Sequence, residues 1–361
     1  MLRVLDLFAG IGACSKALEN LGIEHKIVDA VEIDKYAIKS FNAIHGTSFD
    51  PQDICEWDKD IEVDLIMHGS PCQDFSIAGK QAGGDKDSGT RSSLMYETLR
   101  IVEKLKPKYV IWENVKNLLS KKHRHNFDAY LEAMEELGYM NYYQVLNAKD
   151  YGVPQNRERV FTVSVLGDGD FKFPHPIPLE KKLKDVLEKE VDEKYYLSEK
   201  AMSCFMSDGT GKYPRKERFL QNINRKNQDI GNSITTRAGS RPTDNFIKEP
   251  FIVASRGRNP NNPNDRTTGV PTEQRLEPKF DGTTNTITTV QKDNYVATPY
   301  RIRKLTPKEC WRLMGFDDAD FDKAKKVNSN TQLYKQAGNS IVVNVVEEIF
   351  KELLNRKICI C

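Results

Sequence analysis

The sequence predicts an α/β fold in which a doubly wound, mostly parallel, Rossmann-like sheet is joined to a second, smaller β-rich domain. Strand and helix patterns alternate over the first 165 residues, a glycine turn follows the first strand directly, and the composition changes after residue 176. Alternation of this kind puts helices on both faces of a parallel sheet and ligand sites at the carboxyl ends of its strands.

Short apolar runs predict the strands, and apolar residues at helical spacing predict the helices. Strands are expected at residues 2–7, 26–32, 63–68, 109–112, 142–147 and 159–165. Helices are expected after the glycine turn as far as residue 21, and at residues 36–44, 94–105 and 124–137. Near the end, TPKE at 306–309 predicts a capped helix through Met314, and a last helix at 341–354 follows a turn at 338–340.

A domain boundary is predicted at residues 171–178, which read FKFPHPIP, because closely spaced prolines exclude a continuing helix or interior strand. The larger domain is expected to contain residues 1–176 and 330–361, and the smaller domain, with its hinge, residues 177–329. The smaller region contains a weak repeat, NSITT and NTITT. Two similar β units would produce that repeat, and so would shared strand composition.

The bulk composition excludes several classes of protein. Of 361 residues 39% are hydrophobic and 29% charged, and no apolar run is long enough to span a bilayer. The first residues soon reach an acidic residue, Asp6, and then a glycine turn, which predicts a buried strand instead of a signal peptide. Seven scattered cysteines argue against a disulfide framework, and Cys359 and Cys361 lack further metal ligands nearby. We therefore expect a reducing, cytoplasmic setting with no membrane partner and no metal.

Positive charge collects in one segment although the net charge is only +2. Residues 201–270 hold 12 Lys or Arg against 6 Asp or Glu, a surplus of +6, so by subtraction from the total of +2 the rest of the chain carries −4. A surface that faces nucleic-acid phosphates requires such a concentration, and a solvated basic loop would also show it.

A nucleoside cradle is predicted at the ends of the first strands. Residues 6–12 read DLFAGIG, and the glycines let a ligand approach the backbone, although Ser15 stands where a full dinucleotide motif has a third glycine. Glu32 ends the second strand and can accept from both ribose hydroxyls. Asp53 can accept from an adenine amino group, with Ile54 against the ring. Nicotinamide enzymes and methyl-donor enzymes both use such a glycine turn. A strand-to-helix turn that binds no ligand could have the same sequence pattern.

A cysteine turn follows the strand at 63–68, so it lies at the same sheet edge as the cradle. Residues 69–76 read GSPCQDFS, in which Pro71 stiffens the turn and Cys72 is presented at the carboxyl end of the strand. A buried core cysteine needs no such turn. Cysteine is suited to covalent catalysis because its thiolate is nucleophilic and also leaves again.

These motifs resemble those of the DNA cytosine-5 methyltransferase family, of the type found in bacterial type II restriction–modification systems. Besides the cysteine turn, six blocks match in the family's order: the turn at 6–12, Glu32 and Asp53, ENV at 113–115, QNRER at 155–159, LTPKE at 305–309 and GNS at 338–340. The intervening segment, between Arg159 and Leu305, shares no motif and corresponds to the family's target-recognition region.

The resemblance implies a mechanism in which Cys72 adds to carbon 6 of cytosine and thereby activates carbon 5 toward a methyl donor. Glu113, directly after an apolar strand, would share a proton with N3 and bind the exocyclic amine. Arg157 and Arg159 are spaced by two on an expected strand and would point to one face, with Arg159 favoured to hold the cytosine O2. Paired surface arginines would be the plainer interpretation of these two residues alone.

The resemblance also implies S-adenosyl-L-methionine as the methyl donor, with S-adenosyl-L-homocysteine as the product. Its expected contacts come from the glycine turn, the strand ends and the chain's last block. They are Phe8, Gly10, Gly12, Glu32, Ile33, Asp53, Ile54, Pro71, Leu94, Asn339 and Ser340.

Double-stranded DNA is the expected partner, and the target cytosine must leave the stack because its reactive face is covered in a duplex. The glycine-rich segment 79–91 is predicted to be a mobile loop that closes over the DNA. DNA-binding candidates are Gln73, Ser76, Arg237, Arg241, Arg256 and Arg258. A bacterial or phage restriction–modification setting would add a cognate endonuclease that acts separately, and we expect the chain to be a monomer.

Three alternatives remain open at this point. A transfer-RNA cytosine methyltransferase would use the same motifs, although the long basic segment favours DNA. A DNA-binding regulator without catalysis would need none of the chemical residues. A nicotinamide oxidoreductase would give no joint role to Cys72, Glu113 and Arg159.

Overall fold

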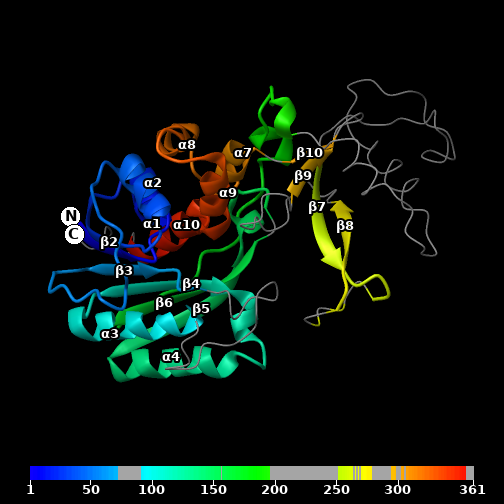
Figure 1. The fold of residues 1–361 in the computed structure, drawn as a ribbon. Helices are drawn as coiled ribbons and strands as arrows, with labels where there is room; N and C mark the ends of the chain where they lie inside the picture. Colours follow the sequence, from blue (N-terminus) through cyan, green and yellow to red (C-terminus); the bar gives the residue numbers. More distant parts are fainter. Residues whose placement is uncertain are drawn as a thin grey trace, which may run out of the picture.

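The computed structural model describes residues 1–71, 91–155, 157–195, 251–262, 265, 267, 270–278, 294–297, 302–304 and 306–354. In this part of the chain a six-stranded sheet is flanked by helices, and a four-stranded sheet lies beyond it (Figure 1). The predicted fold class, a mixed α/β fold with a mostly parallel sheet, is therefore confirmed.

The large sheet contains all six predicted strands in the order β2-β1-β3-β4-β6-β5. Pairs β1–β2, β1–β3 and β3–β4 are parallel, whereas β6 runs antiparallel to both β4 and β5. The bounds are β1 (Leu2–Leu7), β2 (His25–Val31), β3 (Leu65–His68), β4 (Tyr109–Val115), β5 (Tyr139–Asn147) and β6 (Glu158–Leu166). The reversal of β6 brings the beginning of that strand to the edge where the parallel strands end.

Helices cover both faces of this sheet because successive strand residues point to opposite sides. In β4, Tyr109 and Ile111 belong to one apolar cluster, and Val110 and Trp112 belong to the other. The first cluster contains residues of α1 (Ala13–Asn20) and α10 (Val343–Leu354), and the second contains residues of α3 (Met95–Leu105) and α4 (Arg124–Glu136) (Figure 1).

The C-terminal segment packs against the large sheet, where residues of α10 share an apolar cluster with those of α1. Thr306 and Glu309 form a capping box at the start of α7 (Pro307–Arg312), as predicted, and two helices that the sequence did not predict follow, α8 (Asp318–Lys325) and α9 (Asn330–Asn339). Lys16 of α1 is buried between Asp317 and Asp320, at 2.9 and 2.7 Å from their carboxylate oxygens. This ion-pair cluster fastens α8 to the N-terminal half.

The predicted turn at 338–340 is wrong for its first two residues. Gly338 and Asn339 lie in the last turn of α9, and only Ser340, with ψ 156°, leaves the helix. The helix continues because its apolar side chains, Leu333 and Ala337, are buried in the core on one face. Packing therefore outweighs the turn preference of the Gly-Asn pair.

Residues 183–195 cross from the large sheet toward the small one while remaining attached to the C-terminal helices. The backbone N–H of Glu188 donates to Glu309, at 2.9 Å, and Arg312 donates to the carbonyl of Val186, at 3.0 Å. Asn330 donates to the Tyr195 hydroxyl, at 2.9 Å. These bonds hold the stretch that follows the proline-rich segment.

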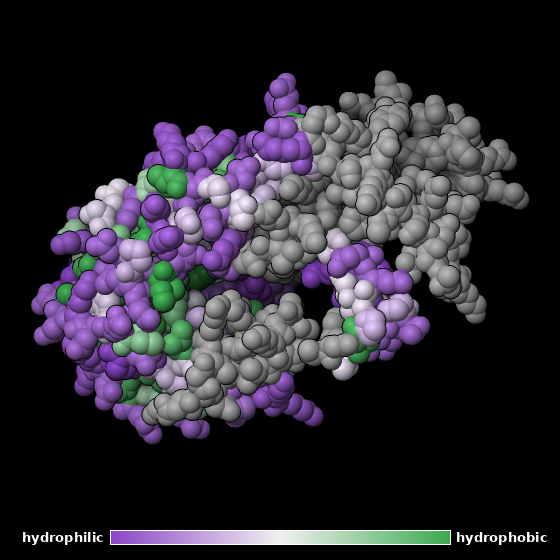
Figure 2. All heavy atoms as spheres, in the orientation of Figure 1, coloured by the Kyte–Doolittle hydropathy of each residue, from purple (hydrophilic) through white to green (hydrophobic). Residues whose placement is uncertain are grey.

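The small sheet is entirely antiparallel, with the order β10-β9-β7-β8. Its strands are β7 (Phe251–Arg258), β8 (Glu273–Pro278), β9 (Asn294–Ala297) and β10 (Ile302–Lys304). The predicted NSITT and NTITT repeat lies outside the described residues. Figure 2 shows the surface hollowed between the large body and the β7–β8 hairpin. None of the described helices has the length and apolar character needed to cross a membrane.

Candidate active site

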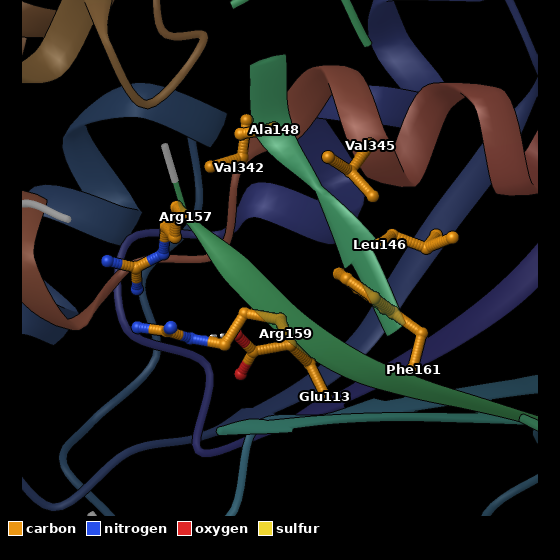
Figure 3. A pocket seen from close by; sticks show the side chains of 8 residues that line it. All are labelled: Glu113, Leu146, Ala148, Arg157, Arg159, Phe161, Val342 and Val345. Carbon is orange, nitrogen blue, oxygen red and sulfur yellow. Dashed lines mark ion pairs between the residues drawn. The ribbon is translucent and has the colours of Figure 1, made fainter. Parts of the chain in front are cut away.

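The reversed strand β6 places Arg159 beside Glu113 at the carboxyl edge of β4. In the β4–β6 register Val115 is opposite Arg159, so the arginine lies two residues beyond Glu113 on the neighbouring strand. Its Nε is 3.0 Å from Glu113 Oε1, and the two side chains are 16% and 11% exposed (Figure 3). Such low exposure reduces solvent screening, so this ion pair orients both groups.

A small cavity opens on this ion pair (Figure 3). Glu113 Oε1 is buried and, despite its closeness to Arg159, makes no hydrogen bond of acceptable geometry among the described residues. A buried carboxylate oxygen with this free capacity is suited to a ligand that brings an N–H donor. The lining residues are Glu113, Leu146, Ala148, Arg157, Arg159, Phe161, Val342 and Val345.

The turn that leads into Cys72 is anchored next to Glu113. Ser70 accepts a hydrogen bond at its Oγ from Trp112 Nε1, at 2.9 Å, and at its carbonyl from Asn114 Nδ2, at 3.3 Å. A Cβ placed on Gly69 would lie 3.8 Å from Glu113 Oε2. The described end of this turn is therefore held against the same strand segment that carries the glutamate.

Buried aromatic side chains pack beneath the turn. His68, the last residue of β3, is fully buried, stacks on Trp112 with ring centroids 5.7 Å apart, and lies 3.0 Å from the Tyr130 hydroxyl. Burial lowers the pKa of His68 to about 3, so the imidazole is neutral at physiological pH. His68 therefore supports the turn as a packed aromatic ring and does not act as a charged group.

The glycine turn after β1 is bound to the end of β2 through Glu32. One Glu32 oxygen accepts from the N–H of Gly10, at 3.0 Å, and the other from the N–H of Asp34, at 2.8 Å. Gly10 has φ 57°, and the nearest atom to an added Cβ would be a carbonyl oxygen 4.0 Å away, which leaves open space for a ligand.

The second glycine of the turn, Gly12 (φ 83°), has no such open space, because an added Cβ would lie 2.1 Å from the ring of His45. Gly12 thus permits close packing of α2 (Lys35–His45).

Two carboxyl groups meet behind this turn. Asp6 is 5% exposed, and its Oδ2 has no hydrogen-bond partner among the described residues. Burial, together with the nearby charge of Glu32, raises the pKa of Asp6 well above its usual range, and burial also raises the pKa of Glu32. A ligand with positive charge and hydroxyl donors would relieve this repulsion, whereas the diphosphate of a dinucleotide would increase it.

Three of the predicted cofactor contacts share one apolar cluster, the cluster on the α3–α4 face of the sheet. Ile54 is buried in it, and Phe8 and Leu94 pack against it partly exposed. Ile33 is 68% exposed at the end of β2, which is unusual for a large apolar side chain. Asp53 holds its own turn, because its Oδ1 accepts from the N–H of Cys55 at 3.0 Å. Pro71 is the last described residue before Cys72.

Arg157 joins the site to the C-terminal segment. It precedes β6 and is 4% exposed, and its guanidinium donates to the carbonyls of Gly338, at 3.3 Å, and Ser340, at 2.8 Å. In Figure 3 its guanidinium lies on the same side of the cavity as that of Arg159. Gln155 adds a bond to the carbonyl of Leu313, at 2.6 Å. This arrangement positions the predicted contacts Asn339 and Ser340.

A sequence profile of C-5 cytosine-specific DNA methylases matches residues 2–355. The chain belongs to this family. Its activity is therefore that of a DNA cytosine-5-methyltransferase, in agreement with the resemblance found in the sequence. Among the described residues of the enzyme, no group of acidic, His and Cys side chains is arranged to hold a metal ion.

The relatives match nearly the whole length of the enzyme. The type II methyltransferase M2.ScrFI of Lactococcus lactis subsp. cremoris is 34% identical over 98% of this chain and 99% of its own length. The orphan methyltransferase M.SPBetaI of Bacillus phage SPbeta is also 34% identical, over 98% of each chain. The crystal structure of the S. pombe Dnmt2 methyltransferase has the same fold, with a TM-score of 0.61 and 19% identity over 99% of each chain.

The arginines that the sequence offered as DNA contacts fall into two groups. Arg256 and Arg258 project from the same face of β7, and both approach Glu277 of β8. Arg258 forms a bidentate pair with it, and the Nε of Arg256 is 3.8 Å away. In the structure of the enzyme Glu277 therefore holds both guanidinium groups. Arg237 and Arg241 lie outside the described residues, as do Cys72, Gln73, Ser76 and residues 79–90 of the predicted loop segment 79–91.

The sequence interpretation assigned no role to Asp6, and it did not predict the bonds that Arg157 makes to the C-terminal segment. Asp6 was quoted in the glycine turn without a role, although a charged residue inside the apolar strand LRVLDL is a signal of a functional or paired carboxylate. Nothing local to Arg157 predicts its bonds to residues more than 180 positions away.

Proposed function

We propose that the enzyme methylates carbon 5 of a cytosine that is flipped out of duplex DNA at a specific sequence, with Cys72 as the covalent nucleophile and S-adenosyl-L-methionine as the methyl donor. The observation that carries the proposal is the Glu113–Arg159 pair, whose Nε–Oε1 separation is 3.0 Å, beside the anchored turn that leads into Cys72. An acid beside a cation is the pair that a pyrimidine edge would need, and this supports the proposal.

The proposed chemistry assigns each residue a step. The Cys72 thiolate forms a bond to carbon 6, and the electrons of the C5–C6 double bond become available at carbon 5. Glu113 supplies a proton toward N3 and accepts from the exocyclic amine, and Arg159 donates to O2. After carbon 5 has taken the methyl group, it loses its proton, the Cys72–C6 bond breaks, and its electron pair returns to the thiolate while the double bond re-forms.

The residues present fit S-adenosyl-L-methionine. When bound, it supplies a methyl group activated by a positively charged sulfur, which leaves as part of S-adenosyl-L-homocysteine. The acidic pair of Asp6 and Glu32 suits that charge and the ribose hydroxyls, and the space at Gly10 suits close approach to the backbone. The remaining proposed contacts are Phe8, Gly12, Ile33, Asp53, Ile54, Pro71, Leu94, Asn339 and Ser340. Gly12 would contribute only through its backbone, because His45 fills the space where a side chain would lie.

The two sheets suggest how DNA would be bound. We assign catalysis to residues 1–176 and 330–361, and target recognition to residues 177–329, with the stretches 183–195 and 306–329, which pack on the large domain, as the hinge. The surplus of basic residues in 201–270 would neutralise phosphates, and DNA would occupy the hollow between the sheets (Figure 2). Gln73, Ser76 and arginines 237, 241, 256 and 258 are proposed to contact DNA. Arg258 would have to exchange Glu277 for a base or phosphate.

The setting follows from the relatives, which include type II and phage orphan methyltransferases. We propose a monomeric enzyme of a bacterial or phage-infected cytoplasm that protects a recognition sequence, with any cognate endonuclease acting as a separate protein.

Transfer of labelled methyl groups tests the substrate. With labelled S-adenosyl-L-methionine, the purified enzyme should label duplex DNA and leave transfer RNA unlabelled. Bisulfite sequencing of DNA from cells that express the enzyme should then show protected cytosines within one sequence context. Labelling of transfer RNA alone would assign the other substrate, and protection without a common context would remove the claim of sequence specificity.

A further inference from the structure

We call residues 52–59 the adenine segment, because they include Asp53 and Ile54. The segment contains one turn and no helix or strand, and side-chain hydrogen bonds hold it in place. Three of these holding bonds converge on Asp29 of β2. Its Oδ1 accepts from Gln52 Nε2 at 2.9 Å, and its Oδ2 accepts from Trp57 Nε1 at 2.8 Å and from Lys59 Nζ at 2.7 Å.

Asp29 is suited to this task because it is buried and fully occupied. It is 1% exposed, and the N–H of Ala30 also donates to its Oδ1, at 3.0 Å. Burial alone would raise the pKa of Asp29, but the bonds from Lys59, Trp57 and Gln52 hold it below its usual value, so the group is a carboxylate at physiological pH. A charged acceptor strengthens each of these hydrogen bonds.

The adenine segment is also bound by α3. Arg100 donates to the carbonyls of Ile54, at 3.0 Å, and Trp57, at 2.9 Å. The backbone N–H of Gln52 also donates to the carbonyl of Glu32, at 2.9 Å, which ties the segment to the proposed ribose-binding residue. The segment is thus held by a buried anion and by a cation, with Asp53 and Ile54 near its beginning.

We propose that Asp29 is a positioning residue for the nucleoside end of the donor site: it fixes the adenine segment in its binding conformation without touching the ligand. This inference rests on the proposed use of S-adenosyl-L-methionine. It predicts an effect on ligand affinity that is separate from the methyl-transfer step, because Asp29 lies on β2 and Glu113 on β4, with β1 and β3 between them in the sheet.

The test is the Asp29→Asn variant, which keeps the shape of the side chain but removes its charge and turns one acceptor into a donor. If the segment is correctly placed in about a tenth of the molecules, the Kd for S-adenosyl-L-methionine should rise about 10-fold. The Kd for adenosine alone should rise by the same factor, and kcat at saturating donor and the Kd for duplex DNA should stay within about 2-fold of the wild-type values.

Two further variants guard against a folding artefact. Lys59→Met removes a half-exposed partner of Asp29 and should raise the same two Kd values by about 3-fold, since only one bond is lost. Asp64→Asn makes the same exchange at a partly exposed carboxylate that pairs with Arg3 at the beginning of β1, and it should leave both Kd values unchanged. If Asp29→Asn and Lys59→Met bind both ligands as tightly as the wild type does, the positioning role of Asp29 is overturned, but the proposed donor site is not. A wild-type chain that binds neither ligand would overturn the donor site itself, and parallel losses of kcat and DNA binding in Asp29→Asn would show general destabilisation instead of positioning.

Discussion

Replacing Cys72 with serine should abolish methyl transfer while DNA binding persists. A hydroxyl at this position stays protonated at neutral pH and is a poor nucleophile toward carbon 6, so the loss in rate should be at least about 10⁴-fold. The Kd for duplex DNA should change by less than about 3-fold, because the exchange of sulfur for oxygen removes no charge from a protonated side chain. Labelled methyl incorporation and a DNA mobility-shift titration measure the two quantities.

The matched control for this variant is Cys361→Ser, which makes the same exchange at the end of the sequence and should retain full activity. Substantial activity in Cys72→Ser would remove the nucleophile from the mechanism. Loss of DNA binding in proportion to activity would indicate a structural role for the cysteine turn instead.

Replacing Glu113 with glutamine is expected to have the second-largest effect, a fall in kcat of about 10²- to 10⁴-fold. Glutamine preserves the size of the side chain but carries no transferable proton, and it loses the ion pair with Arg159, whose Nε lies 3.0 Å from Glu113 Oε1. The proposed donor-binding residues Gly10 and Glu32 follow other strands than β4, which carries Glu113. The Kd for S-adenosyl-L-methionine should therefore stay within about 2-fold of the wild-type value. Single-turnover kinetics and equilibrium donor binding separate the two quantities.

Glu62→Gln provides a control with the same chemical change. Glu62 is 86% exposed, and it pairs with Arg3 far from the carboxyl edge of the sheet, so kcat should be unaffected. Equal losses of kcat and donor affinity in Glu113→Gln would contradict an acid role and indicate that Glu113 only supports the site.

Local patterns predicted the strands well because a buried strand is a short run of apolar residues wherever it lies in the sheet. They could not predict the direction of β6, since alternation along a strand is the same in both directions. That direction decides the site: only an antiparallel β6 brings Arg159, at its beginning, next to Glu113, near the end of β4. The sequence named both residues from their motifs, and the sheet explains why they meet.

Contacts between distant segments account for most of what the sequence left out. Arg157 was interpreted as a second arginine on the same strand face, but it precedes β6 and holds the carbonyls of Gly338 and Ser340. Gly12 was expected to make room for a ligand, and the structure fills its space with His45. In each case the partner lies on another element, so no spacing in the local sequence could have indicated it.

The most direct test of the central claim is a trapping experiment with duplex DNA that carries 5-fluorocytosine at the target position. Fluorine at carbon 5 cannot leave as a proton does, so the covalent bond between Cys72 and carbon 6 should persist after methyl transfer. Intact mass spectrometry should find one DNA strand plus one methyl group attached to the wild-type enzyme, and none attached to Cys72→Ser. The absence of an adduct from an enzyme that methylates ordinary DNA, or an adduct that survives in Cys72→Ser, would contradict the account.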